Sequence, residues 1–161
     1  MSHFATRGAF SDPATSTPGY ELGTERSELV AQALVTSATT IIQGWATYRY
    51  IQNTTGAGTA IAANLLVQRD TTTVTGNEGV VSAATSLPQY ILGVTMVSIP
   101  DNYYAWVQCK GPALLTGDGA VAAGEYVVSD AAGLCDTLAG AEVPIGMALE
   151  ADSPTLVVDL F

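Results

Sequence analysis

The side chains that most often perform catalysis are few and scattered in this sequence. The only histidine, His3, lies in an irregular N-terminal stretch, so neither a Ser-His-Asp nor a Cys-His arrangement has a histidine in the body of the chain. The sequence contains no HExxH motif, P-loop, nucleophile elbow or EF-hand spacing. We therefore expect a protein that is not an enzyme and that holds no cofactor or metal ion.

Acidic residues beside turns are the next candidates for chemistry. Glu150 and Asp152 could pair as the carboxylates of a glycosidase do, but they flank a turn in an acidic region, and we expect both to be solvated. Residues 117–119 and 130–133 resemble fragments of calcium-binding loops. Each fragment lacks alternating oxygen ligands, so ordinary turns explain them better.

The cysteines and clustered aromatic residues have structural explanations. Cys109 and Cys135 form no metal-ligand cluster, and two buried free thiols are favoured over a disulfide because nothing indicates an oxidising compartment. Tyr103, Tyr104 and Trp106 could stack on sugars or bases. In a strand whose sides alternate, packing in the core or at a subunit interface is the favoured role.

Composition and charge narrow the classes of function. Only 12% of the 161 residues are charged, against roughly 25% in ordinary soluble domains, which suits a surface covered by other subunits. The net charge of −10 argues against direct binding to nucleic acid, and no apolar run is long enough to cross a membrane. From Asp101 onward there are nine acidic residues and a single base, Lys110. This C-terminal part suits a solvated outer face, and the nearly neutral N-terminal part suits a docking surface.

Residues 1–23 are predicted to form an extended N-terminal arm. The segment is rich in Ser, Thr, Pro and Gly and cannot build a core of its own. Phe4, Phe10, Tyr20 and Leu22 are spaced along it, and a purely solvating tail does not need such residues. We expect these four side chains to contact a partner surface on which the arm becomes ordered.

Residues 24–161 are predicted to form one mainly-β domain, either a small barrel or a sandwich. A short helix over residues 24–36 is expected from the spacing of Leu29, Val30, Ala33 and Leu34, with a strand as its competitor. Gly, Pro, Asn and Asp separate the β-rich runs that follow. The predicted strands are residues 45–52, 65–69, 79–84, 90–99, 103–110, 113–116, 125–129, 145–150 and 155–160.

An internal duplication is the most specific feature of the chain. The run AIAANLLVQRD from Ala60 aligns with AVAAGEYVVSD from Ala120, and ILGVTM from Ile91 aligns with PIGMAL from Pro144. The alignment predicts pseudo-repeats over residues 60–111 and 120–161. Asn64 and Gly124 then occupy equivalent turns, and Gly93 and Gly146 equivalent bends within strands. The alternative is a chance similarity between segments of small residues.

The second copy carries a resemblance to a known family. The runs VAAGEYVVSDAAGL from Val121, PIGMALE from Pro144 and VVDLF from Val157 resemble the capsid cement or head decoration proteins of tailed bacteriophages. The likeness extends more loosely over residues 44–161. Asn64 stands where that family's pattern has a glycine, and residues 1–23 match nothing in the pattern.

The resemblance implies a structural virion protein made in the bacterial host cytoplasm and bound to the outer surface of the capsid. Its partners would be the major capsid protein and further copies of itself, arranged as a homotrimer. Such a protein stabilises the mature shell by binding it more tightly than the precursor. Two other classes remain open: a head-fibre or receptor- or carbohydrate-binding adhesin, and a β-clip enzyme or small-molecule-binding domain.

Overall fold

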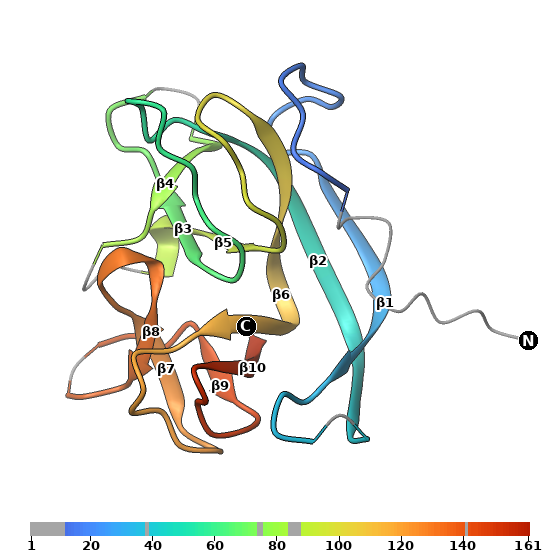
Figure 1. Ribbon diagram of the computed structural model, residues 1–161, viewed down its shortest axis with the longest axis vertical. Helices are drawn as coiled ribbons and strands as arrows, with labels where there is room; N and C mark the ends of the chain where they lie inside the picture. Colours follow the sequence, from blue (N-terminus) through green and yellow to red (C-terminus); the bar gives the residue numbers. More distant parts are fainter. Residues whose placement is uncertain (1–11, 38, 74–75, 84–87, 141) are drawn as a thin grey trace, which may run out of the picture.

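The computed structural model describes residues 12–37, 39–73, 76–83, 88–140 and 142–161, and the chain is almost entirely β (Figure 1). The predicted mainly-β fold is confirmed. Two short 3-10 turns, η2 (Pro88–Tyr90) and η3 (Ala131–Gly133), interrupt the series. The strands are β1 (Glu25–Ala33), β2 (Ile41–Asn53), β3 (Leu66–Arg69), β4 (Glu78–Val81), β5 (Ile91–Thr95), β6 (Tyr104–Thr116), β7 (Tyr126–Ser129), β8 (Cys135–Thr137), β9 (Gly146–Ala148) and β10 (Thr155–Leu160).

The helix expected over residues 24–36 is wrong, because this segment forms strand β1. β1 pairs with β2 in antiparallel register along its whole length, from Glu25 opposite Arg49 to Ala33 opposite Ile41. Val30 is buried on one side of the strand, whereas its neighbour Leu29 is exposed on the other. Pairing with a long neighbour therefore outweighs the weak helical spacing.

Strand β6 is continuous where the sequence predicts two strands. It runs through Gly111, where the backbone has a φ of 83° and where an added Cβ would collide with the carbonyl oxygen of Trp45. A glycine here lets β6 pass close to β2 and continue into the second half of the molecule. The short strand β8 was not predicted, since Cys135, Asp136 and Thr137 give almost no strand signal.

The strands form two rings that share β6 (Figure 1). In the first ring the order is β2-β4-β3-β5-β6, and pairing between β2 and the first half of β6 closes it. In the second ring the later half of β6 pairs with β10, and the order continues through β9 and β7 to β8. A parallel bridge between Gly117 and Cys135 brings β8 back to the end of β6. We call these the first and second units.

The two units share the same strand register at matching positions. Val67 pairs with Gly93 between β3 and β5, and Val127 pairs with Gly146 between β7 and β9. A Cβ on Gly93 would lie 2.6 Å from the carbonyl oxygen of Gln108 on the next strand. A Cβ on Gly146 would lie 2.6 Å from the corresponding oxygen, that of Asp159. Both glycines are therefore required by the same close approach of two backbones.

The turns before β3 and β7 are equivalent as well. Asn64 has a φ of 63° and Gly124 a φ of 85°, so both occupy the left-handed region. Each donates its backbone N–H to a matching carbonyl oxygen, Asn64 to Thr95 at 2.7 Å and Gly124 to Ala148 at 2.8 Å. The shared backbone conformation explains why one copy tolerates Asn where the other has Gly.

Each unit has its own apolar core, and the two cores are built from matching positions. The register extends the repeat upstream of the sequence alignment, so that residues 48–53 of β2 match residues 112–117 of β6. Six matched pairs are buried in the two units: Ile51 and Leu115, Ile61 and Val121, Val67 and Val127, Leu92 and Ile145, Ala105 and Leu156, and Val107 and Val158.

Val157 and Val158 lie next to each other in β10. Adjacent residues of a strand point to opposite sides, so one side chain of such a pair is often exposed. Both are fully buried. Val158 belongs to the core of the second unit, and the backbone of Val157 bonds with Leu149 and with the buried side chain of Glu150.

Candidate interaction surfaces

The end of the predicted arm lies against the protein's own β body. The backbone of Thr15 exchanges two hydrogen bonds with Tyr104, and Gly23 donates its N–H to the carbonyl oxygen of Tyr50 at 2.8 Å. The ring of Tyr20 packs 5.3 Å from that of Tyr50 and 5.1 Å from that of Trp106, centroid to centroid. These contacts fix the chain at the point where it enters β1.

Four residues of the arm were predicted to contact a partner, and the structure describes two of them, Tyr20 and Leu22. Tyr20 remains 42% exposed and carries the guanidinium of Arg26 at 4.6 Å from its ring centroid. Leu22 is half-buried against the aromatic cluster of Tyr48, Tyr50 and Trp106. Phe4 and Phe10 lie outside the described residues. Contact between the arm and a partner stays a prediction.

Strands β1 and β2 present an exposed apolar face that the sequence analysis did not identify. Leu29 lies directly opposite Trp45 in the register, and Ala33 opposite Ile41, so each pair shares one side of the ribbon. Trp45 is 69% exposed, Ile41 56% and Leu29 39%. We call these three residues the ribbon patch. Side chains this large and this exposed on one face are typical of a contact surface.

The edge beside the ribbon patch is also unpaired. Within the described part of the chain β1 pairs with β2 alone and lies at the end of the strand order. The far end of the same face is polar, because Arg49 forms an ion pair with Glu25 and the hydroxyls of Ser27 and Thr47 bond at 2.9 Å. A partner could therefore find both an apolar surface and free backbone groups here.

Glu150 anchors the connection between β1 and β2. Its carboxylate accepts the N–H groups of Val35 and Thr36, each at 2.8 Å, the hydroxyl of Thr36 at 2.7 Å and the N–H of Val157 at 2.9 Å. The residue is only 3% exposed, so the expectation that Glu150 is solvated is wrong. Burial by itself raises the pKa of this carboxyl, but the hydrogen bonds from Thr36, Val35 and Val157 outweigh it and hold the pKa below its ordinary value.

The consequence of this anchor is a fixed ribbon. Glu150 immediately follows the β9 region of the second unit, whereas Val35 and Thr36 belong to the loop beside the ribbon patch. Because the loop is bonded to a buried charge, the exposed end of the ribbon is held in one position relative to the second unit. A pre-positioned surface binds with less loss of conformational entropy.

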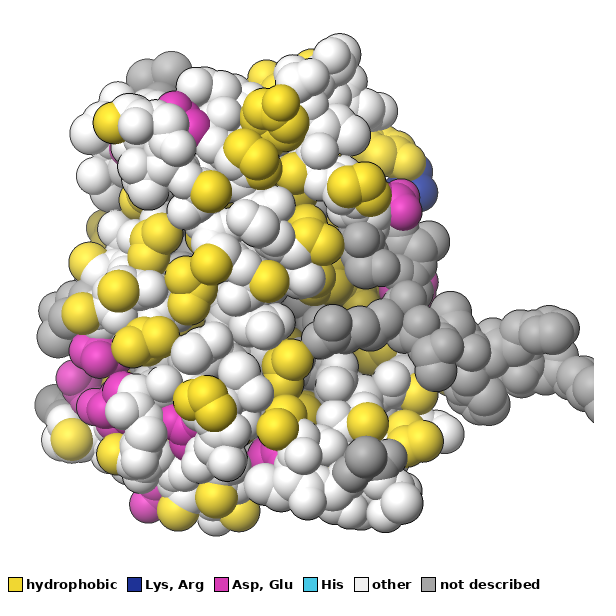
Figure 2. Space-filling model, in the orientation of Figure 1, with side chains coloured by type: hydrophobic (Ala, Val, Ile, Leu, Met, Phe, Trp, Pro, Cys, Tyr) yellow, Lys and Arg dark blue, Asp and Glu magenta, His cyan; other side chains and the backbone are white. Residues whose placement is uncertain are grey.

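The second unit carries most of the acidic side chains. Residues 112–161 contain eight acidic residues and no Lys or Arg. Figure 2 shows several of them gathered at the lower left of the view, where Figure 1 places β7 and β8. Among the described residues no group of three His, Cys, Asp or Glu side chains is arranged to hold a metal ion.

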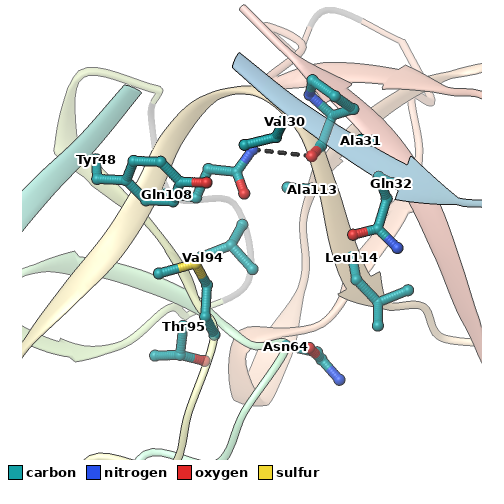
Figure 3. A pocket seen from close by; sticks show the side chains of 12 residues that line it. Val30, Ala31, Gln32, Tyr48, Asn64, Val94, Thr95, Gln108, Ala113 and Leu114 are labelled. Atoms are coloured by element: carbon teal, nitrogen blue, oxygen red, sulfur yellow. Dashed lines mark hydrogen bonds between the residues drawn. The ribbon is translucent and has the colours of Figure 1, made fainter. Parts of the chain in front are cut away.

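A small cavity lies between β1, β5 and β6 (Figure 3). Its volume is about 30 Å³, and Val30, Tyr48, Val94 and Gln108 are among its lining residues. The amide of Gln108 spans one side by donating to the carbonyl oxygen of Pro112 at 2.9 Å. A space of this volume is large enough to hold a water molecule.

Both cysteines are free thiols. Cys135 is fully buried, and burial together with the nearby carboxylates of Asp152 and Asp118 raises its pKa to about 12. Cys109 is half-buried and donates its S–H to the carbonyl oxygen of Thr47 at 3.3 Å. Desolvation also raises the pKa of Cys109. Both thiols therefore stay protonated at neutral pH and are poor nucleophiles.

Comparison with known proteins shows the fold. No family model and no curated protein matches the chain. Among solved structures, the chain is similar to the crystal structure of the head fiber gp8.5 N base of bacteriophage phi29. The TM-score is 0.54 and the sequence identity 11%, over 71% of this chain and 92% of that chain. In the described residues no helix is long and apolar enough to span a membrane.

Proposed function

We propose that this protein is a structural component of a bacteriophage virion that binds the outer surface of the capsid and stabilises the mature shell. The ribbon patch carries the proposal, because it combines a 69% exposed tryptophan, a free strand edge and an anchor on a buried carboxylate. Such a surface is suited to a permanent contact with another protein and needs no catalytic group. The fold shared with a phage head fiber base supports a virion role.

The charge distribution supports an orientation on the shell. Every Lys and Arg that the structure describes lies in the first unit or the ribbon, including Arg26, Arg49 and Arg69. Residues 112–161 contain acidic residues but no Lys or Arg. In the proposed arrangement the ribbon faces the major capsid protein and the second unit faces solvent. An outer face of net negative charge keeps assembled particles apart in solution.

A second function is favoured by the structural comparison itself. The protein could serve as the base of a head fibre, the part that attaches a longer projecting structure to the capsid, since the similar solved structure is described as such a base. Both functions use the same capsid contact and differ in what projects from the particle. Cryo-electron microscopy of capsids carrying the protein distinguishes them: low knobs at lattice positions indicate decoration, and elongated projections indicate a fibre.

The test is a binding measurement with decoration-free capsids of the phage that encodes the protein. Wild-type protein should bind saturably, and Trp45→Ser should weaken binding by roughly 30-fold, the effect of losing one central aromatic contact of about 2 kcal/mol. Val143→Ser is the matched control, because Val143 is 56% exposed but lies in the second unit. Failure of the wild-type protein to saturate would overturn capsid binding. Equal weakening by both substitutions would overturn the role of the ribbon.

A further inference from the structure

A second, larger hollow lies between the two units. It has a volume of about 140 Å³, and its walls are apolar: they include Leu66 and Ile91 from the first unit and Pro144, Ile145, Leu160 and Phe161 from the second. Figure 1 shows these two groups of strands above and below β6. The hollow is therefore a product of the duplication, formed where one copy meets the other.

One exposed aromatic side chain, that of Phe161, lines this hollow. Phe161 is 58% exposed, and its ring lies 6.1 Å from that of Tyr126, which is 50% exposed, in an edge-to-face arrangement. Tyr90, next to Ile91 in the chain, is 40% exposed. The exposed ring of Phe161, with Tyr126 against it, leaves apolar surface at the hollow that an apolar group would cover favourably.

The volume indicates what the hollow can accept. An engineered protein cavity of about 150 Å³ with apolar walls stays dry and binds benzene. The hollow has nearly this volume, and apolar residues line it, although it is partly open to solvent; its size matches one phenyl ring. A Phe side chain from another segment would match the size of the hollow.

The chain itself contains a segment with the matching chemistry. Residues 1–11 carry Phe4 and Phe10, the cation Arg7 and no acidic residue. One wall of the hollow belongs to the second unit, whose residues 112–161 contain eight acids and no Lys or Arg. The apolar lining thus matches the two Phe side chains, and the net negative charge of the second unit as a whole matches Arg7.

We propose that the hollow receives Phe4 or Phe10 from the N-terminal segment of a second copy of this chain. Tyr104 and Trp106 of β6 hold the end of the arm, whereas Cys109, farther along the same strand, lines the hollow. The end of the arm is therefore held by residues that do not line its own hollow. Eleven extended residues span at most about 40 Å, enough to reach an adjacent molecule.

An arm from one copy in the hollow of the next is a head-to-tail contact. Contacts of this kind close into a ring when the rotation between copies permits it. The proposal thus supplies a contact through which the homotrimer expected from the sequence would assemble. It concerns the free protein and does not depend on capsid binding.

Sedimentation velocity of the full-length protein over a range of concentrations tests the proposal. The wild-type chain should self-associate. The double substitution Phe4→Ser with Phe10→Ser should weaken association by roughly tenfold or more, because the contact then no longer buries a Phe ring. Phe161→Ala should also weaken it by removing part of the wall. Arg7→Glu should weaken it at low salt, with a smaller difference from wild type at high salt.

Trp45→Ser is the control, since the ribbon patch takes no part in this contact and the variant should associate as wild type does. Circular dichroism establishes that each variant keeps its β structure. A wild-type chain that stays monomeric at all concentrations would overturn the proposal. The same monomeric result would be seen if the arm occupied the hollow of its own molecule. Unchanged association of the Phe4 and Phe10 double variant would overturn it equally. Capsid binding is measured separately, so either result leaves the proposed function to its own test.

Discussion

Substituting the paired glycines is the most direct test of the duplicated architecture. In Gly146→Ala the new Cβ would lie 2.6 Å from the carbonyl oxygen of Asp159 and 2.6 Å from a methyl group of Val158. Contacts below 3.0 Å essentially never occur for a real Cβ, so β9 and β10 must separate. β10 cannot yield freely, because it pairs with β6 from Thr155 to Leu160.

The expected loss follows from the forced separation. Overpacking of this kind costs about 1–3 kcal/mol, which is the loss of unfolding free energy we expect for Gly146→Ala. Gly93→Ala meets the carbonyl oxygen of Gln108 at the same 2.6 Å and in addition has a φ of 150°, which L residues rarely adopt. It should therefore lose a further 1–3 kcal/mol or so.

Urea unfolding at neutral pH, followed by circular dichroism, measures both losses. Gly119→Ala is the control, because Gly119 also has a positive φ, of 101°, but an added Cβ there meets open space. It should lose only about 1 kcal/mol, from backbone conformation alone. The reasoning is refuted if Gly146→Ala unfolds at the wild-type urea concentration, or if Gly93→Ala costs no more than the Gly119 control.

Two further predictions concern the anchor and the equivalent turns. Glu150→Gln should lower the unfolding free energy by about 2–4 kcal/mol at pH 7, because an amide cannot accept all four hydrogen bonds and leaves buried donors unpaired. Since the folded-state pKa of Glu150 is lowered, its contribution is present above the ordinary value of 4.5 and is lost as the pH falls through the folded-state pKa. The difference in unfolding free energy between wild type and variant should therefore be smaller at pH 3 than at pH 7. Gly124→Asn should cost less than Gly124→Ala in thermal unfolding, because Asn64 already occupies the equivalent turn at a φ of 63°, and the opposite order would contradict the equivalence.

Local sequence patterns were sufficient to predict the strands in which these patterns are strong. Residues 155–160 were predicted as a strand and form β10 with the same bounds, because five of the six residues are β-branched or apolar and a turn precedes them. The equivalence of Gly93 with Gly146 was also predictable, since the same backbone approach imposes glycine at both sites. Local sequence patterns did not predict β8. Its residues have little strand propensity of their own, and they form a strand because they pair with β7.

The contact surface was not predictable from the same signals. Trp45 looks like a core residue in the sequence, yet it is 69% exposed, because its side of the ribbon is uncovered in the single chain. Glu150 looks like a surface residue, yet it is buried, because the loop at Val35 and Thr36 brings backbone donors to it from more than a hundred residues away. Burial depends on which segments meet, and local composition does not contain that information.

By itself the sequence determined the β class, the turns and the repeat, since these depend on residue types a few positions apart. Only the tertiary structure decided that β6 serves two rings, that each unit closes around a separate core and that the β1–β2 ribbon leaves an apolar face uncovered. The physical reason is that strand pairing joins residues far apart in the chain. Its register is set by the whole set of competing partners, and this set exists only once the chain has folded.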